Sequence, residues 1–326
     1  MSFYTLNSEI TGITIALPKK KIINPNRKKN DKNFISHTGV KSYFSNDQLK
    51  TSQLCVAASK KLIDGLKWKK KEIGFLIFVS QTRDHILPQT SCKIQEDLKL
   101  DSNILVYDIP QGCSGFVNGL YISFLISKNL KKNGILMCGD IVSKLINKKD
   151  KKLKSLFGDC GAAIAIEYNK KNSYKNFFSF GTDGSGSGDL IYKSNGLNSY
   201  SEKGYLKMNG SKIFEFALNR VPLQIQNILI EAKKKIKNIK YVIFHQANKY
   251  LIKNLGRKVG FKEKNILYSI ENFGNTNSAS IPLTIFNNYN KIKNSDILIS
   301  GFGVGLTWSS AIIKIKKLKQ RHLIKL

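Results

Sequence analysis

The chain is short of the residues that small domains use as covalent or metal cross-links. Its 326 residues include only five cysteines, which are scattered and odd in number, and no two of them form a CxxC pair. The four histidines are also far apart along the chain. This usage indicates a reducing compartment and predicts neither a disulfide framework nor a zinc site. A chain of this length buries roughly three quarters of its unfolded surface, so it needs neither for stability.

Long hydrophobic runs are absent as well. No apolar run in the sequence approaches the roughly 18 residues that a membrane-spanning helix needs. The N-terminus lacks the basic region, apolar core and small-residue cleavage site that together mark a signal peptide. We therefore expect a cytoplasmic protein without a membrane span.

Acidic residues are scarce, since 22 Asp and Glu stand against 54 Lys and Arg and give a net charge of +32. Such a charge is typical of proteins that bind nucleic acids. The lysines, however, are spread over the whole chain among many Asn and Ile residues, a composition typical of A·T-rich genomes. Aromatic residues do not interleave with the basic clusters as a stacking surface requires. We predict no nucleic-acid binding and favour a basic face that receives an acidic protein partner.

The chain repeats itself at a long period. Four segments of the first half, each typical of a buried strand, resemble four segments of the second half in the same order. The pairs are residues 73–81 and 239–247, 104–108 and 266–270, 135–139 and 297–301, and 159–166 and 305–312. Strands of parallel sheets resemble one another in any case, because they are all rich in Val, Ile and Leu. The constant order and spacing favour a true duplication.

Between the strands lie segments with helical periodicity, such as residues 51–66 and their counterpart 212–232. Alternating strands and helices predict an α/β protein with mostly parallel sheets, and two copies predict two sheets packed through shared helices. We divide the chain into halves at 1–170 and 171–326. Residues 170–206 are rich in Gly, Ser, Asn and Tyr, and we interpret them as the loop that connects the halves.

Cys113 lies where a strand gives way to a helix. The strand signal covers residues 103–107, Pro110 and Gly112 indicate a turn, and an apolar helix follows from Phe116. A thiol at a helix N-terminus lies at the positive end of the helix dipole, which favours the thiolate and makes a nucleophile. The segment alone leaves open whether Cys113 is instead a small buried residue.

Three further segments lie at corresponding places in the duplicated halves. His245 directly follows one strand, Asn275 is the counterpart of Cys113, and the turn Gly303–Gly305 follows another strand. Because sites in α/β sheets form beyond the carboxyl ends of strands, these groups should converge on one cavity. Taken singly, they also fit a core histidine, a turn asparagine and a tight turn.

Each group has a role if the reaction joins two thioesters through a carbon–carbon bond. Cys113 would attack an acyl thioester, while the backbone N–H groups of Cys113 and Gly305 stabilise the oxyanion. A second thioester would then lose carbon dioxide and form an enolate. The His245 imidazole and the Asn275 amide are suited to donate hydrogen bonds to that enolate, and neither has to ionise.

At these residues the chain resembles the thiolase superfamily, and within it the β-ketoacyl-acyl carrier protein synthase III family. The resemblance rests on residues 111–116 (Gln-Gly-Cys-Ser-Gly-Phe), 245–248 (His-Gln-Ala-Asn), 274–276 (Gly-Asn-Thr) and 301–308 (Gly-Phe-Gly-Val-Gly-Leu-Thr-Trp). It implies a homodimer with a five-layered αβαβα fold. It also implies ping-pong chemistry, in which an acyl-CoA primer loads the cysteine and malonyl-acyl carrier protein condenses with it. Acyl-CoA and the carrier's phosphopantetheine are then substrates, and no cofactor is bound permanently.

The resemblance carries the catalytic roles over to Cys113, His245 and Asn275. It also implies that Asn248 forms a hydrogen bond near His245 and that Phe214 forms a wall of the pantetheine channel.

Several channel positions depart from the family pattern. Phe34 and His37 stand where a tryptophan and an arginine usually enclose the CoA adenine, and Lys151 (or its neighbour Lys152) replaces another CoA-binding arginine. Leu87 stands where a partner-subunit phenylalanine often limits the primer pocket, and Val304 replaces a glycine of the oxyanion turn. Arg and Lys are not equivalent at such sites, so the primer and its carrier stay open.

The predicted function is chain initiation in fatty acid synthesis. The alternatives are a specialised relative that makes or moves an unusual acyl group in secondary or glycan-modifying metabolism, and acyl transfer without condensation. The tail Lys314–Leu326 is interpreted as a frayed terminus rather than as a docking segment for an acidic carrier.

Overall fold

Two β-sheets form the frame of the molecule in a computed structural model, which describes residues 2–25, 32–192 and 204–326. The strands are β1 (Ser2–Thr5), β2 (Ser8–Leu17), β3 (Lys21–Ile23), β4 (Ser42–Phe44), β5 (Ile73–Val79), β6 (Leu105–Ile109), β7 (Asn133–Asp140), β8 (Cys160–Tyr168), β9 (Asn176–Thr182), β10 (Leu190–Tyr192), β11 (Leu206–Met208), β12 (Tyr241–Phe244), β13 (Ser295–Gly303), β14 (Thr307–Ile315) and β15 (Gln320–Lys325). The helices are α1 (Lys32–Thr38), α2 (Thr51–Leu66), α3 (Thr90–Asp97), α4 (Gly115–Leu130), α5 (Lys151–Lys154), α6 (Gly210–Glu231), α7 (Lys249–Val259), α8 (Ile270–Phe273), α9 (Ser280–Asn287) and α10 (Tyr289–Ile292).

The central strands of the two large sheets have the same order and the same directions. Within the described residues one sheet runs β15-β2-β8-β7-β5-β6 and the other runs β1-β9-β14-β13-β12. The central pairs β2–β8 and β8–β7 are antiparallel, as are β9–β14 and β14–β13. The next pairs, β7–β5 and β13–β12, are parallel in both sheets. The predicted duplication is therefore confirmed. The prediction of mostly parallel sheets is wrong, because β8 and β14 run opposite to both of their neighbours.

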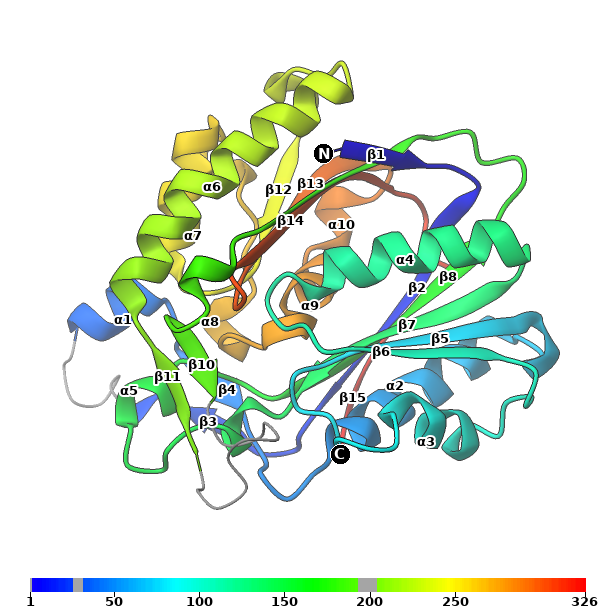
Figure 1. Cartoon of the computed structure of the whole chain (residues 1–326), viewed down its shortest axis with the longest axis horizontal. Coiled ribbons are helices and arrows are strands. Elements are labelled where there is room, and N and C mark those ends of the chain that lie inside the picture. The colour runs from blue at the N-terminus through cyan, green and yellow to red at the C-terminus, as the bar shows by residue number, and fades with distance from the viewer. Residues whose placement is uncertain (1, 26–31, 193–203) are drawn as a thin grey trace.

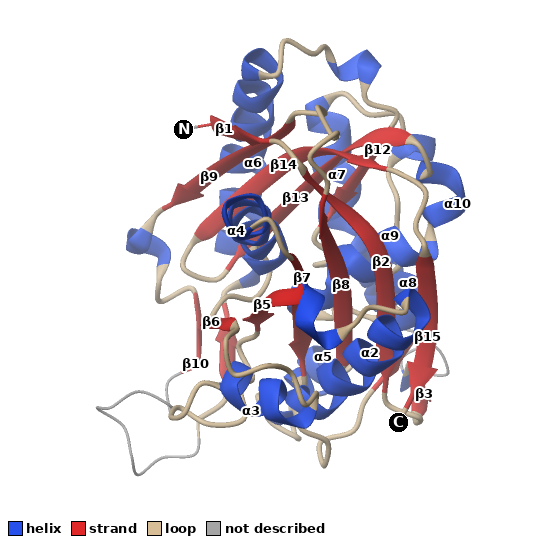
Figure 2. Ribbon diagram, turned by 90° about the vertical axis from the view of Figure 1, so that its right-hand side faces the viewer, coloured by secondary structure: helices blue, strands red, loops and turns tan. Residues whose placement is uncertain are grey.

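Helices cover both outer faces of the sheets and fill the space between them, which gives five layers (Figure 1). Helices α2 and α3 pack on the outer face of the first sheet, and α6 with α7 covers the outer face of the second. Figure 2 shows α4 nearly end-on between the sheets, where α9 also lies. The five-layered αβαβα prediction is confirmed.

The strands are apolar along their length because both faces of each sheet are buried. In β5, Phe75 and Ile77 point into the central layer, whereas Leu76 and Phe78 pack against the outer helices. Since side chains alternate between the two faces of a strand, a strand buried on both faces needs an unbroken apolar run. This is why the strand segments were visible in the sequence.

The counterpart of β6 in the second half is not a strand. We predicted a strand over residues 266–270, but there the ladder is reduced to one parallel bridge between Val242 and Ile266, and α8 begins at Ile270. The segment resembles a strand in the sequence because the Ile266 and Leu267 side chains are apolar and buried. Burial alone does not require a strand ladder. The segment therefore keeps the position of a strand but not its extent.

The segment 170–206, which we interpreted as a connecting loop, contains an interior strand. Strand β9 pairs with β1 on one side and with β14 on the other, and residues 193–203 of the segment lie outside the described residues. The prediction was wrong because β9 contains Asn, Ser, Gly and Thr beside its phenylalanines, which hides the apolar signal.

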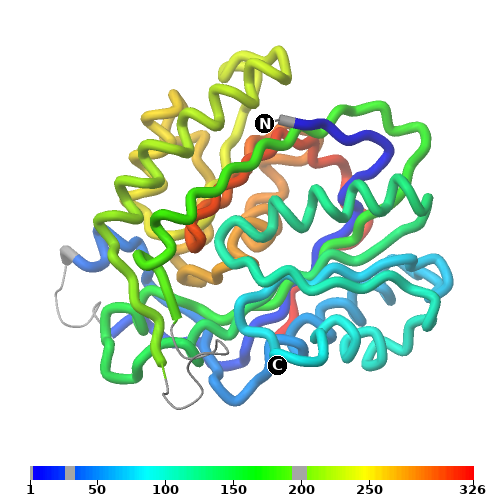
Figure 3. Tube along the Cα trace, viewed as in Figure 1, coloured from blue at the N-terminus to red at the C-terminus, as the bar shows by residue number. Residues whose placement is uncertain are grey.

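The two ends of the chain exchange sheets. Strand β1 pairs with β9 in the second sheet, while β15 runs parallel to β2 at the edge of the first. Figure 3 shows the C-terminus beside elements from the start of the chain. The frayed tail that we predicted is therefore wrong, because β15 is held by a ladder from Gln320 to Lys325. The domain boundary at residue 170 stays a prediction. None of the described helices is long and apolar enough to cross a membrane.

Candidate active site

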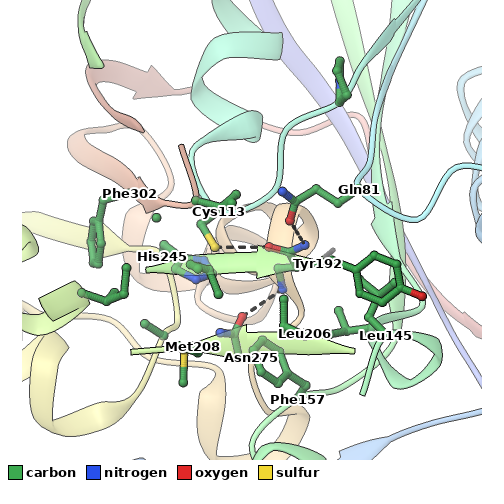
Figure 4. A pocket seen from close by; sticks show the side chains of 18 of the residues that line it. Gln81, Cys113, Leu145, Phe157, Tyr192, Leu206, Met208, His245, Asn275 and Phe302 are labelled. Carbon is green, nitrogen blue, oxygen red and sulfur yellow. Dashed lines mark hydrogen bonds between the residues drawn. The ribbon is translucent and has the colours of Figure 1, made fainter. Parts of the chain in front are cut away.

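Cys113, His245 and Asn275 line one cavity of about 310 Å³. Cys113 lies between β6 and α4, directly before Ser114 at the N-cap of the helix. His245 follows β12, and Asn275 follows α8 in the second half of the chain. Figure 4 shows the three side chains facing a common space from different elements. The structure thus brings together the three groups that the sequence assigned to one site.

The sulfur of Cys113 is enclosed by backbone and amide groups. Its Sγ lies 3.2 Å from Oδ1 of Asn277, to which the thiol donates a hydrogen bond. Gly303 packs against the sulfur so closely that a Cβ there would stand 2.8 Å from Sγ. Only a glycine leaves this space beside the sulfur free.

The protein keeps the Cys113 thiol protonated. Burial and the nearby Asp140 carboxylate raise the pKa of Cys113 to about 12, although backbone N–H groups oppose this shift. We expected the helix N-terminus to favour the thiolate, but the loss of water around the sulfur has the larger effect. At neutral pH the Cys113 side chain is therefore a thiol rather than a thiolate.

The backbone N–H that meets the Cys113 sulfur belongs to Val304. The role that we predicted for the Gly305 N–H, at the oxyanion, stays a prediction. Gly305 instead has a φ of +140°, a conformation open to glycine and strained for other residues. It shapes the turn that connects β13 with β14, and this turn aims the preceding amide at the sulfur. The N–H groups of Cys113 and Val304 thus both lie beside the sulfur.

His245 is a buried, neutral imidazole. Its Nδ1 lies 2.8 Å from Oγ of Ser280, and its ring meets the Phe302 ring edge-on at 5.9 Å. Burial lowers the pKa of His245 to about 3, so the ring carries no charge at neutral pH. A neutral imidazole held in this way is a hydrogen-bond donor and a poor general base.

Asn275 is held by its backbone and by one side-chain oxygen. Its backbone N–H donates to Leu156 over 2.9 Å, and its carbonyl accepts from the N–H of Gly158 over 3.0 Å. Its Oδ1 accepts from the N–H of Asn277 at 3.0 Å. Within the described part of the chain, no acceptor is recorded for Nδ2, although the residue is only 4% exposed. This amide therefore has a donor to offer to a ligand in the cavity.

A buried carboxylate joins the loops on the two sides of Cys113. Asp140, at the end of β7, accepts from the backbone N–H of Gln81 at 2.8 Å and from Oγ of Ser278 at 2.6 Å. Burial raises the pKa of Asp140 to about 6. Because Ser278 follows Asn277, this one side chain fixes the backbone beside two amides that line the cavity.

Part of the cavity wall is apolar, and we call this part the apolar arm. Its walls include residues from the β10–β11 hairpin and from neighbouring segments, namely Leu145, Phe157, Leu190, Leu206, Met208 and Ile213. The hairpin is tied down by a backbone hydrogen bond from Leu206 to Leu145 of 2.8 Å. Such a lining suits a flexible chain with few charges. Among the described residues, no group of three or more His, Cys, Asp and Glu side chains could hold a metal ion.

Comparisons with known proteins agree with this geometry. Residues 107–184 match the 3-oxoacyl-[acyl-carrier-protein] synthase III family, and residues 229–315 match the family of its C-terminal part. A β-ketoacyl-[acyl-carrier-protein] synthase III of Clostridium perfringens strain SM101 is 32% identical over 324 residues, which cover 95% of this chain and 99% of that enzyme. The chain belongs to the β-ketoacyl-[acyl-carrier-protein] synthase III family.

Other relatives agree with this membership. A synthase III of Lactococcus lactis is 30% identical and covers 94% of this chain and 99% of its own. The crystal structure of a 3-oxoacyl-(acyl-carrier protein) synthase from Burkholderia xenovorans LB400 has a TM-score of 0.93 and 30% identity, and it covers 100% of this chain and 99% of its own. The synthase III fold therefore extends over the whole chain.

The synthase III positions that we predicted for the channel lie outside the cavity lining. Phe34 and His37 are on α1, and the His37 ring lies 5.3 Å from that of Tyr250. The Phe214 ring stacks on the same tyrosine at 5.7 Å. His37 and Phe214 thus meet on one aromatic side chain near α7, and the channel roles of Phe34, His37 and Phe214 stay predictions.

The remaining predicted channel residues are at the surface or within a helix cap. Lys151 is exposed on α5, and Leu87 is 82% exposed on the loop after β5. Asn248 caps α7, where its Oδ1 accepts from the N–H of Leu251 at 2.7 Å. The side-chain partner of His245 is Ser280, and the hydrogen bond near His245 that we expected of Asn248 stays a prediction.

Our sequence reasoning missed three residues of the site: Gln81, Asn277 and Ser280. Each had a usable signal. Gln81 lies just beyond the carboxyl end of β5, and Asn277 and Ser280 follow Asn275 within a few residues. The duplication pointed to these segments but not to the single side chains within them that face the sulfur.

Proposed function

We propose that this chain catalyses the decarboxylative condensation of an acyl primer with malonyl-acyl carrier protein, the reaction that initiates fatty acid chains. The observation that carries the proposal is the meeting of Cys113, His245 and Asn275 in one cavity of a synthase III fold. A nucleophile and two neutral donors around one space are what the two steps of this reaction require.

The first step loads the primer onto Cys113. The sulfur attacks the carbonyl carbon of an acyl-CoA, and the N–H groups of Cys113 and Val304 donate to the oxyanion. The thiol proton passes to the departing CoA sulfur, so an acyl-cysteine and free CoA result. Loss of one such oxyanion donor typically costs about 10²- to 10³-fold in rate.

The second step forms the carbon–carbon bond. Malonyl-acyl carrier protein loses carbon dioxide, and the electron pair of the broken bond forms an enolate. The His245 imidazole and Nδ2 of Asn275 donate to the enolate oxygen. The enolate carbon attacks the acyl-cysteine, the Cys113 sulfur departs with the electron pair, and a proton from solvent restores the thiol.

The low pKa of His245 favours condensation over simple acyl transfer. A transferase that moves the acyl group to an alcohol or amine needs a base. An imidazole with a pKa of about 3 is a weak base. Enolate stabilisation needs only a neutral donor. The apolar arm of the cavity suits the pantetheine chains of CoA and of the carrier protein as successive occupants.

Further parts of the proposal concern the setting of the reaction. An acidic carrier protein matches the excess of basic residues, with a net charge of +32. A homodimer in the cytoplasm is part of the same proposal, since it is the arrangement that the family resemblance implies. Leu87, exposed in the single chain, is the residue that we place at the subunit boundary.

Intact-mass analysis tests the proposal directly. The protein is incubated with a panel of short acyl-CoA thioesters, and malonyl-acyl carrier protein is then added. We expect an acyl mass on Cys113, followed by carbon dioxide release and a 3-oxoacyl carrier protein. An acyl mass that moves to an alcohol or amine without carbon dioxide release would favour the transferase instead.

A further inference from the structure

The part of the cavity wall that Gln81 and Asn277 form beside Cys113 is polar, in contrast to the apolar arm. The carboxamides of Gln81 and Asn277 both line it, and Arg83 stands on the same loop as Gln81. Figure 4 shows the Gln81 side chain on the same side of the cavity as Cys113. An alkyl primer would bring its carbon atoms against these polar groups.

The two amides form a chain that ends on the sulfur. Nδ2 of Asn277 donates to Oε1 of Gln81 at 3.0 Å, and Oδ1 of Asn277 accepts from the Cys113 thiol at 3.2 Å. Gly112 makes room for the pair, because a Cβ at this position would overlap both amide oxygens. The backbone of Asn277 is left-handed, with a φ of +50°, and Asn is among the residues that tolerate this conformation.

Loading of the primer breaks the last link of this chain. Once the sulfur is acylated it has no proton to donate, so Oδ1 of Asn277 loses its partner. Nε2 of Gln81 has no recorded acceptor among the residues that the structure describes. The acyl-enzyme therefore presents one acceptor and one donor to the acyl group. Turning both amides over exchanges their roles and still leaves one of each.

We propose that the preferred primer is a short hydroxyacyl thioester with its hydroxyl on carbon 2 or carbon 3. The hydroxyl donates to Oδ1 of Asn277 and accepts from Nε2 of Gln81. Both amides then have a hydrogen-bond partner for each of these atoms in the acyl-enzyme. This inference rests on the proposed function, because it concerns the group that Cys113 carries.

The energetic reason is the cost of leaving polar groups unpaired. An alkyl acyl group buries an amide oxygen and an amide N–H without partners, and each unmade hydrogen bond weakens binding of that group. A site built to hydrogen-bond a hydroxyl therefore rejects the analogue that lacks it. A carboxylate would meet the Arg83 guanidinium, but it would also place negative charge against the Asn277 oxygen.

Matched thioesters test the proposal. The rate of acyl-enzyme formation is measured by intact mass with 3-hydroxybutanoyl-CoA, 2-hydroxybutanoyl-CoA, butanoyl-CoA and succinyl-CoA. We expect at least one hydroxyacyl thioester to load with a kcat/KM at least about tenfold above that of butanoyl-CoA. Butanoyl-CoA or succinyl-CoA loading as fast as both hydroxyacyl thioesters would overturn the inference.

Variants locate the effect. Gln81→Leu should lower the hydroxybutanoyl-to-butanoyl ratio at least about fivefold, and Asn277→Leu should do the same. The exposed Gln48 provides a matched control, and Gln48→Leu should leave the ratio at its wild-type value. A preference that survives both Gln81→Leu and Asn277→Leu would contradict the assignment to these amides.

The two proposals fail in different ways. If the wild-type protein loads and condenses butanoyl and hydroxybutanoyl groups equally, the primer inference is wrong and the proposed function stands. If no acyl-CoA loads Cys113 and no carbon dioxide is released, the proposed function is wrong and the primer inference with it.

Discussion

The two halves of the molecule differ at their predicted second strand and at the segment that follows it. In the first half, β6 is a full strand and leads through Cys113 into α4, a helix of 16 residues. In the second half, one bridge at Ile266 replaces the strand, and the four-residue helix α8 leads to Asn275. The central strands of the two sheets have the same order, whereas the segments that lead to Cys113 and to Asn275 differ.

This difference follows from what each segment has to present. A nucleophile needs one atom on a rigid backbone, which a strand and a long helix provide. The second segment presents several polar side chains from a short turn, where Asn275, Asn277 and Ser280 are all buried. The duplication thus supplied one scaffold twice, and the chemistry was divided between the copies.

Removal of the nucleophile separates the halves most sharply. Cys113→Ala leaves the second-half donors in place but removes the atom that carries the primer, so we expect acyl-enzyme formation to fall by about 10³-fold or more. The acyl mass shift should disappear after incubation with acyl-CoA. Cys92→Ala, which alters an exposed cysteine, is the control and should load normally. An acyl mass retained in Cys113→Ala would mean that another residue is loaded.

Removal of the second-half donors should give the reverse result. His245→Ala and Asn275→Ala keep the sulfur and the N–H groups around it, so loading should continue. Carbon dioxide release from malonyl-acyl carrier protein should fall by about 10²- to 10³-fold, because the enolate loses a donor. Asn272→Ala, an exposed asparagine of the same segment, is the matched control. Loss of loading with intact decarboxylation would reverse the roles of the two halves.

The pH dependence of the alkylation rate of Cys113 shows whether its side chain is a thiol or a thiolate at neutral pH. With a pKa of about 12, the thiolate fraction rises with pH throughout the neutral range. Alkylation of Cys113 by iodoacetamide should therefore increase about tenfold per pH unit from roughly pH 7 to pH 9, without a plateau. Mass analysis of the peptide that contains Cys113 separates it from Cys92. A plateau below about pH 8 would show that the helix N-terminus outweighs burial.

The smallest effect concerns the support of His245. Ser280→Ala removes the hydroxyl that holds Nδ1, so the ring loses one orienting hydrogen bond. A bond worth about 1 kcal/mol corresponds to roughly fivefold in the condensation rate. Loading of Cys113 should stay at the wild-type rate, because Ser280 does not contact the sulfur. An equal fall in both steps would instead indicate a general loss of structure.

Most of the central strands could be predicted because burial on two faces demands an unbroken apolar run. Strands β5, β7, β8, β12, β13 and β14 meet this demand and were found. Strand β9 mixes phenylalanines with small polar residues, and β15 carries Gln, Arg, His and Lys at a sheet edge. Neither shows a clear local signal, and only pairing with distant strands makes them part of a sheet.

The sequence by itself determined which residues share the site, because Cys113, His245 and Asn275 each occupy a defined place in a repeated strand order. The tertiary structure decided which atoms meet. The Val304 N–H faces the sulfur, and Asn277 reaches Cys113 across 164 positions of the chain. Contacts of about 3 Å and the loss of water around a group depend on packing in three dimensions, and a linear pattern does not contain them.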